Sequence, residues 1–196
     1  MCAPRTCSLR GPWARRPEAI PPTLFLTVGL PGTGKTTAAR RIEAEHGALR
    51  LTKDEWMKAL YGSENPEQAS DVIEGRLVGI ALRALELGTS VVLDFGLWGK
   101  DERSSLRRAA ADRGAEVVML FCDVDPAEQR RRLDRRLAEE PHTTWPISEA
   151  ELASWANVFQ RPAPEEVDGS EPIPDPPTGF ADWDAWREDR WPPAIR

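Results

Sequence analysis

The segment that most constrains this chain is an apolar stretch that runs directly into a glycine-rich loop and then into a helix. Residues 23–29 (TLFLTVG) are rich in strand formers and are predicted to form a buried strand of a parallel sheet. From Gly29 onward the sequence fits the pattern G-x-x-x-x-G-K-[ST], and good helix formers follow as far as Gly47. An ordinary glycine-rich turn does not need Lys-Thr at the start of the helix, so the sequence predicts a phosphate-binding loop (P-loop).

The residue types in this loop follow from the chemistry of phosphate binding. Glycines let the backbone turn tightly, so that successive N–H groups point at phosphate oxygens, and the helix N-terminus adds partial positive charge. Lys35 is predicted to reach the β- and γ-phosphates of ATP, and the Thr36 hydroxyl is placed to hold Mg²⁺. ATP and Mg²⁺ are therefore the predicted cofactors, and the predicted nucleotide-binding residues are Gly29, Leu30, Pro31, Gly32, Thr33, Gly34, Lys35, Thr36 and Thr37.

The rest of the chain alternates between short apolar runs and helical patterns. Further strands are predicted at residues 48–52, 90–94 and 116–122. Further helices are predicted at residues 54–61, 64–87, 101–113, 125–140 and 148–159. Because strands that alternate with helices form parallel sheets, the predicted fold class is α/β: a three-layer P-loop NTPase fold with a parallel sheet of four to five strands flanked by helices.

Three regions differ in composition. Residues 1–22 carry several arginines and turn formers without periodicity, so we predict a disordered leader. Residues 23–160 form the predicted P-loop domain. Residues 161–196 form a C-terminal extension that is rich in proline, yet Trp183, Trp186 and Trp191 at its end predict a short docked helix.

Composition limits the class of function. The net charge is −6 over 196 residues, which argues against a nucleic-acid coat or a membrane-surface protein but leaves a nucleic-acid end possible as a substrate. Three cysteines give no disulfide framework, and no apolar run reaches 18 residues. The N-terminus has no apolar core of a secretory signal, so we expect a cytoplasmic protein.

Two aspartates are predicted to lie near the loop, because ligands of open α/β sheets sit beyond the carboxyl ends of the strands. Asp54 follows the second predicted strand and could accept a proton from a hydroxyl or hold Mg²⁺ through water; alternatively it caps the helix that follows. Asp94 closes a buried apolar run, where a carboxylate typically holds Mg²⁺; alternatively it is a turn residue before Gly96.

The helix over residues 125–140 carries five arginines. Arg132 and Arg136 are four residues apart and therefore share one helical face. An arginine of this helix could close over the phosphates and neutralise charge in the transition state of phosphoryl transfer. Alternatively the arginines form a solvated face paired with neighbouring acidic residues.

The motifs GLPGTGKTT, LTKDEW, VVLDFGLWGKDERSSLRRAAADRGAEV and DVDPAEQRRRLDRRLAE together resemble the small P-loop kinase family, often labelled AAA-type ATP-binding proteins, over about residues 23–160. This family includes polynucleotide kinases, chloramphenicol phosphotransferase and zeta toxins. The resemblance implies that Lys35 and Thr36 serve ATP and Mg²⁺, that Asp54 is the general base for a hydroxyl, and that Arg132 or Arg136 contacts ATP phosphate. It also implies that Asp94 is the strand-end acid, and that Arg103 faces substrate or stabilises its helix.

One departure from the family bears on the acceptor of the phosphate. Polynucleotide kinases place an arginine three residues after the base, and here that position is Met57, followed by Lys58. The sequence therefore favours a small-molecule acceptor such as an antibiotic, nucleoside or sugar derivative, on which Trp56 or Trp98 could stack unless they are packing residues. A polynucleotide 5′-hydroxyl kinase and a P-loop regulator or NTPase switch are the alternatives. The acceptor and the oligomeric state are left open by the sequence.

Overall fold

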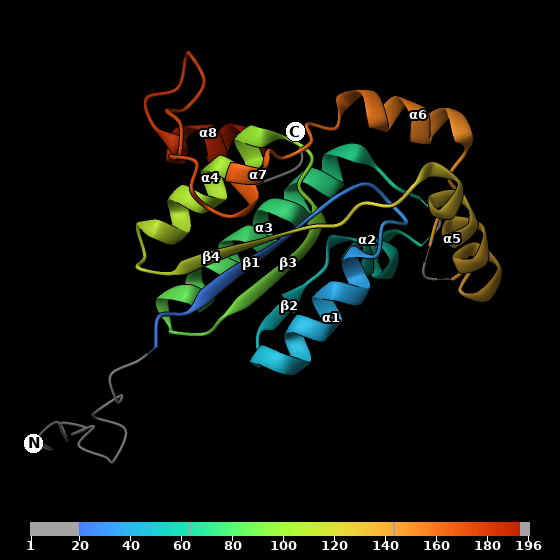
Figure 1. Cartoon of the computed structure of the whole chain (residues 1–196), viewed down its shortest axis with the longest axis horizontal. Coiled ribbons are helices and arrows are strands. Elements are labelled where there is room, and N and C mark those ends of the chain that lie inside the picture. The colour runs from blue at the N-terminus through green and yellow to red at the C-terminus, as the bar shows by residue number, and fades with distance from the viewer. Residues whose placement is uncertain (1–19, 63, 143, 193–196) are drawn as a thin grey trace, which may run out of the picture.

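The computed structural model describes residues 20–62, 64–142 and 144–192, and it has the α/β architecture expected from the sequence (Figure 1). The predicted disordered leader lies almost entirely outside these residues. The strands are β1 (Thr23–Val28), β2 (Leu49–Leu51), β3 (Val91–Gly96) and β4 (Glu116–Phe121). The helices are α1 (Lys35–His46), α2 (Lys53–Tyr61), α3 (Glu67–Glu86), α4 (Lys100–Ala111), α5 (Pro126–Glu139), α6 (Glu149–Val158), α7 (Pro164–Val167) and α8 (Trp183–Arg190).

The four strands form one parallel sheet in the order β2-β3-β1-β4. The apolar run of β1 occupies an interior position, where it pairs with β3 on one side and β4 on the other. This placement explains why β1 is almost continuously hydrophobic, since a strand covered on both faces has no side chain facing water. The predicted α/β fold with a four-stranded parallel sheet is therefore confirmed.

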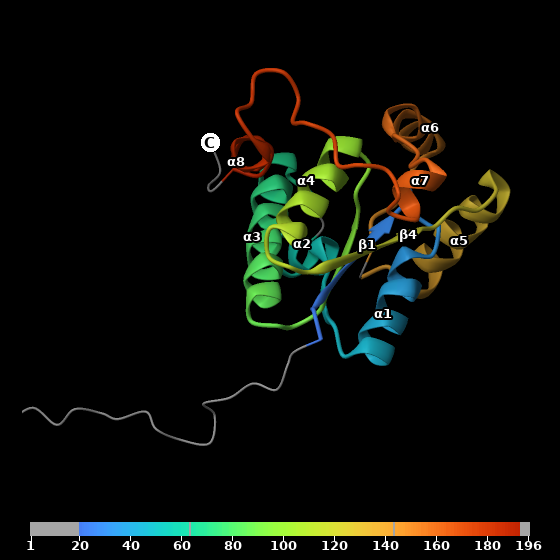
Figure 2. The same cartoon turned by 60° about the vertical axis from the view of Figure 1, so that its left-hand side comes forward.

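Helices cover both faces of the sheet (Figure 2). Alternate residues of β1 and β3, such as Leu26 and Leu93, pack with α3 and α4 in the larger apolar core. Their neighbours Phe25 and Val92 face α1 in a smaller core. The two-residue repeat of the strands thus divides the core into two layers, which gives the three-layer arrangement.

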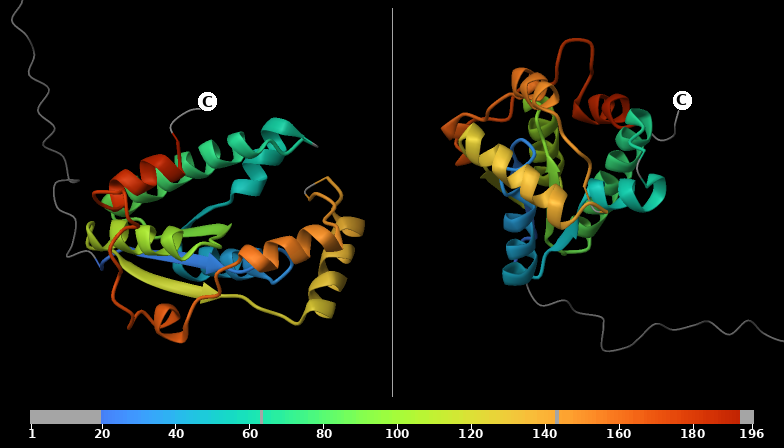
Figure 3. Two further views of the ribbon diagram at one scale, coloured as in Figure 1. Left: turned by 90° about the horizontal axis from the view of Figure 1, so that it is seen from above. Right: turned by 90° about the vertical axis from the view of Figure 1, so that its right-hand side faces the viewer.

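The C-terminal extension packs on the same side as α3 and α4 (Figures 2 and 3). The helix predicted around the tryptophans is present as α8, and Trp183 and Trp191 are buried. The extension also contains the short helix α7, which the proline-rich composition did not predict. Pro164 is the first residue of α7, a position where its missing N–H costs no hydrogen bond.

One strand near the site, β3, ends two residues later than expected from the sequence. Strand β3 continues to Gly96, so Asp94 lies inside the strand and does not end it. The pairing with β1 explains the extra length, because it resumes at Val28 and Gly96 after an irregularity. Within the part of the chain that the structure describes, no helix is long and apolar enough to span a membrane.

Candidate functional site

The P-loop connects β1 to α1 at the carboxyl end of the sheet, as the motif predicts. Its backbone needs glycine at three positions, because Gly29, Gly32 and Gly34 have positive φ angles of 147°, 81° and 101°. A Cβ on Gly29 would lie 2.3 Å from the carbonyl oxygen of Cys122. A Cβ on Gly32 would lie 2.9 Å from Cγ of Leu133 on α5. The loop is thus held between Cys122, which directly follows β4, and α5.

Lys35 is the first residue of α1, and its side chain folds back over the loop. Its Nζ donates a hydrogen bond to the carbonyl oxygen of Leu30 at 2.8 Å. Burial lowers the pKa of Lys35 to about 8, although the negative charges of Asp94 and Asp54 oppose the shift. The ammonium is therefore desolvated in the free protein, and an anion placed beside it would raise its pKa again.

Thr36 and Asp94 are adjacent, as expected for residues that share a cation. The Thr36 hydroxyl donates to Oδ1 of Asp94 at 3.3 Å. Burial raises the pKa of Asp94, while the Thr36 hydrogen bond and the charges of Lys35 and Arg50 oppose the increase. Hydroxyl and carboxylate oxygens are suitable ligands for Mg²⁺, so this pair fits the cation that a P-loop implies.

Arg50 is a site residue that the sequence analysis missed. Its Nη1 lies 3.3 Å from Oδ2 of Asp94, and the same guanidinium contacts Thr52 and pairs with Glu55. The parallel register pairs Arg50 with Val92, and extending this register by two residues brings Thr52 beside Asp94. Alternation along β2 was the signal that could have revealed this side of the site, because Arg50 and Thr52 are two residues apart and share one face.

One face of α5 covers the P-loop. The spacing i, i+3, i+4, i+7 places four residues on that face: Gln129, Arg132, Leu133 and Arg136. Gln129, which the sequence analysis did not single out, donates from Nε2 to the carbonyl oxygen of Pro31 at 2.7 Å. Leu133 packs against Gly32, so both residues fix the loop to the helix.

The two predicted arginines lie on this covering face. Nη1 of Arg132 comes within 3.5 Å of the position that a Cβ of Gly34 would occupy, while Nε pairs with Glu128 at 2.6 Å. Arg136 donates to the Thr144 hydroxyl at 2.8 Å, and its positive charge contributes to lowering the pKa of Lys35. Both guanidinium groups are therefore near the P-loop, and which of them contacts phosphate stays a prediction.

Asp54 is the second residue of α2 and is exposed to solvent. The helix begins one residue earlier than expected, with Thr52 at the N-cap position, so the alternative that Asp54 caps the helix is wrong. Its negative charge acts to raise the pKa of Lys35, against the stronger effect of burial, and adds to the increase that burial causes in the pKa of Asp94, as expected for a carboxylate near both groups. Trp56 on the same helix is 48% exposed and remains available for contact with a ligand.

Trp98 and Arg103 have structural contacts that do not require a substrate. The indole Nε1 of Trp98 donates to the carbonyl oxygen of Gly29 at 3.3 Å, and its ring packs on Trp155. Arg103 is completely buried and forms a two-point ion pair with Glu166, with N···O distances of 2.6 and 3.0 Å. The structure thus supports the stabilising role of Arg103 and contradicts the expectation that it faces substrate.

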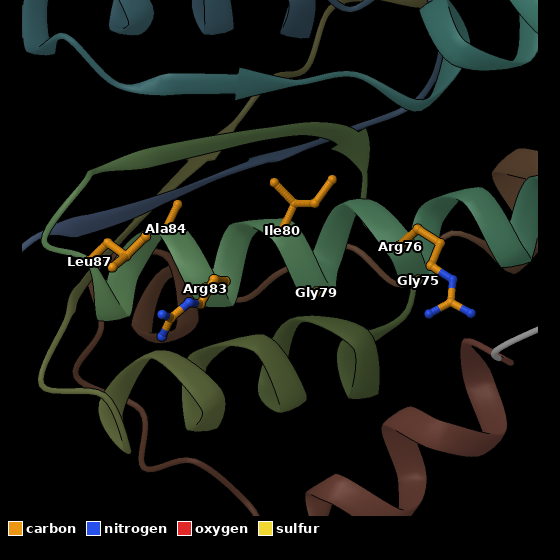
Figure 4. Close-up of a pocket in the computed structure, with 7 residues that line it drawn as sticks. All are labelled: Gly75, Arg76, Gly79, Ile80, Arg83, Ala84 and Leu87. Atoms are coloured by element: carbon orange, nitrogen blue, oxygen red, sulfur yellow. The ribbon is translucent and has the colours of Figure 1, made fainter. Parts of the chain in front are cut away.

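A surface groove of about 480 Å³ lies away from these residues. It runs along one helix, α3, and its lining includes Gly75, Arg76, Ile80 and Arg83 (Figure 4). Its lining contains none of the predicted nucleotide, metal or acceptor residues. The candidate site is therefore the P-loop end of the sheet, formed by β1, β2, β3, α1, α2 and α5.

Comparison with solved structures finds the same fold in proteins of low sequence identity. A putative kinase from Chloroflexus aurantiacus has a TM-score of 0.57 at 19% identity, covering 86% of this chain and 96% of that one. Kti12 of Chaetomium thermophilum, in complex with ADP-AlF3, has a TM-score of 0.54 at 19% identity, with 72% and 82% covered. A gluconokinase from Sinorhizobium meliloti has a TM-score of 0.52 at 15% identity, with 75% and 79% covered.

Comparison by sequence identifies the family. No curated protein matches this chain. A family model described as an AAA domain matches residues 24–162, which includes the P-loop, all four strands and the arginine-bearing helix α5. Because this match spans well over half of the chain, the protein belongs to the AAA domain family.

Proposed function

We propose that this protein is an ATP-dependent kinase that transfers the γ-phosphate to a hydroxyl group of a small molecule. The observation that carries the proposal is that residues suited to three different roles lie near the carboxyl end of the sheet. Lys35 is a partly buried cation for phosphate, Thr36 and Asp94 are adjacent oxygen ligands, and exposed Asp54 lies within the same electrostatic environment. These are the parts that phosphoryl transfer to a hydroxyl requires.

The proposed reaction is an in-line displacement at the γ-phosphorus. Loop N–H groups and Lys35 hold the phosphates, and Arg132 or Arg136 neutralises the charge that develops on them. Thr36 and Asp94 would hold Mg²⁺, which would supply further neutralisation of the phosphate charge. Asp54 accepts the proton of the acceptor hydroxyl while the hydroxyl oxygen bonds to the γ-phosphorus. The bond between the γ-phosphorus and the oxygen that bridges it to the β-phosphorus breaks, and ADP leaves.

A polynucleotide 5′-hydroxyl kinase is less well supported. Met57, at the position where polynucleotide kinases carry a phosphate-binding arginine, is 1% exposed and belongs to the packed interior. The neighbouring Lys58 lies over the Trp145 ring, with Nζ 4.3 Å from its centroid. The chain is also acidic overall, which opposes binding of a polyanion.

The proposal is tested by an acceptor screen with γ-labelled ATP and Mg²⁺, using aminocyclitol, nucleoside, amphenicol and 5′-hydroxyl oligonucleotide acceptors. On the best acceptor, Asp54→Asn should reduce the transfer rate by at least about a hundredfold, because a general base typically contributes that much. Asp101→Asn, an exposed aspartate at the start of α4, is the matched control and should leave the rate unchanged.

Two outcomes would contradict the proposal. If Asp54→Asn retained full transfer to every active acceptor, Asp54 would not be the base. If nucleotide bound and hydrolysed with no acceptor phosphorylated, the protein would instead be an NTPase switch or a nucleotide-binding regulator.

A further inference from the structure

The C-terminal extension lies beyond the family match except for its first two residues, and it contacts α3, the helix that packs against the Asp54-bearing helix α2. Trp191, directly after α8, is buried, and its indole Nε1 donates to Oε1 of Glu74 on α3 at 3.1 Å. The two helices come this close because position 75 is glycine, labelled in Figure 4: a Cβ there would lie 2.7 Å from Cβ of Trp191. Trp191 therefore orients a carboxylate that is itself 4% exposed.

The other oxygen of Glu74 faces α2. It accepts a hydrogen bond from Nζ of Lys53 at 2.7 Å, and Lys53 is the first residue of α2, directly before Asp54. Burial would lower the pKa of Lys53, but the charge of Glu74 and its hydrogen bond outweigh burial and raise it. The lysine is thus kept charged and tied to Glu74, which fixes the start of the helix.

Arg190 adds a second contact to α3 and connects the same network to one further helix, α4. Its guanidinium pairs with Asp71 of α3 at 2.8 Å and with Glu102 of α4 at 2.7 Å. It also lies 3.9 Å from Glu74, so it offsets part of the negative charge that gathers there. The end of α8 is therefore joined to α3 and α4 by both charge and packing.

We propose that the C-terminal extension positions the catalytic helix: Trp191 orients Glu74, Glu74 holds Lys53, and Lys53 fixes the first turn of α2, where Asp54 follows. Trp191, Glu74 and Lys53 are positioning residues in this chain of contacts. The part that concerns Asp54 rests on the proposed function, whereas the coupling of α8 to α2 does not.

Two matched variants, Trp191→Phe and Trp183→Phe, distinguish positioning of α2 from a purely stabilising role of the extension, and a third variant, Lys53→Met, tests the contact from α2. Trp191→Phe keeps an aromatic ring on Gly75 and removes the indole donor to Glu74. Trp183→Phe removes an equally buried indole donor of the same extension, which donates to the carbonyl oxygen of Pro174 at 3.0 Å and does not contact Glu74. Lys53→Met breaks the network from the α2 side and does not depend on how the extension folds.

Amide hydrogen exchange followed by mass spectrometry measures the coupling without any acceptor. Trp191→Phe and Lys53→Met should each accelerate exchange in residues 53–61 by about tenfold, the factor expected for losing a hydrogen bond to a charged group, with α1 unchanged. Trp183→Phe should leave exchange in α2 at the wild-type rate. Binding of a fluorescent ADP analogue should be unchanged in all three variants, because the P-loop is not part of the network.

Transfer of labelled phosphate to the best acceptor of the screen tests the consequence for Asp54. Trp191→Phe should lower kcat while KM for ATP stays constant, and Trp183→Phe should change neither. Wild-type exchange in α2 of both Trp191→Phe and Lys53→Met would overturn the inference, whatever Asp54 does. Accelerated exchange with unchanged kcat would overturn the positioning of Asp54. Accelerated exchange with a fully active Asp54→Asn variant would support the coupling and reject the proposed base.

Discussion

Replacing Glu166 by glutamine should be among the most destabilising single changes of charge in this protein. Glu166 belongs to α7, in the C-terminal extension, and Arg103 belongs to α4; each side chain is 1% exposed in their ion pair. The remaining nitrogen of the guanidinium donates to the carbonyl oxygens of Leu97 and Trp98, at 3.1 and 3.2 Å. Glu166→Gln keeps the shape of the side chain but leaves the buried charge of Arg103 without its counter-ion.

The magnitude follows from this burial. Removing one partner of a buried ion pair costs about 3–5 kcal/mol, because the other charge stays desolvated and uncompensated. For a domain of this size, each kcal/mol lowers Tm by about 2–4 °C, so a decrease of at least about 6 °C is expected. Arg41 and Glu45 provide the comparison, since their side chains are 75% and 52% exposed. Glu45→Gln should cost less than about 1 kcal/mol, since water screens an exposed pair.

Urea unfolding at pH 7, followed by circular dichroism, measures both variants against the wild type. A double variant tests whether the cost comes from the unpaired buried charge or from the loss of the ion pair itself. Arg103→Met combined with Glu166→Met should be much less destabilised than Glu166→Gln, because no buried charge is then left unpaired. If Glu166→Gln were no more destabilised than Glu45→Gln, the reasoning from burial would be refuted.

The other predictions concern the P-loop and its supports. As the pH rises through the pKa of about 8, Lys35 loses its proton. The Kd of a fluorescent ADP analogue should therefore rise about tenfold between pH 7 and pH 9. Lys35→Arg should make the Kd independent of pH over this range, because arginine stays charged. Asp94→Asn should raise the Mg²⁺ concentration for half-maximal binding of this analogue by at least about tenfold, and an unchanged requirement would exclude Asp94 as a ligand. Gly32→Ala should destabilise by more than about 1 kcal/mol in urea, because its Cβ would meet Leu133; Gly179→Ala, with positive φ but open surroundings, controls for backbone strain alone.

The part of the site that lies along one stretch of chain could be predicted from the sequence. The P-loop is such a stretch, because its phosphate-binding groups are backbone N–H groups and the side chains of two consecutive residues, Lys35 and Thr36. Asp94 was found by a similar local rule, since a carboxylate late in a buried strand has to lie at the ligand-binding edge of the sheet. The helical spacing of Arg132 and Arg136 likewise placed both arginines on one face.

What the sequence could not decide is which distant side chain meets each charged group. The residues next to Arg103 in the sequence are the same whether its side chain faces a substrate or a buried glutamate. Only the position of α7 beside α4 brings Glu166 to it. Arg50 joined the site through the register of β2 with β3, and Gln129 through the packing of α5 on Pro31. These partners are 44 to 98 residues apart in the chain, so no local pattern relates them.

The tryptophans show both sides of this division. Their apolar spacing was enough to predict that residues after 180 form a docked helix, because such side chains need an apolar surface to cover them. The hydrophobic effect does not specify which apolar surface covers a side chain, so the sequence left open where the helix docks. The tertiary structure decided that Trp191 meets Glu74, and it did so because Gly75 allows α8 to approach α3. The sequence thus determined the nucleotide-binding loop and the fold class, whereas only the folded chain determined how Trp191, after α8, is connected through Glu74 to Lys53 at the start of α2.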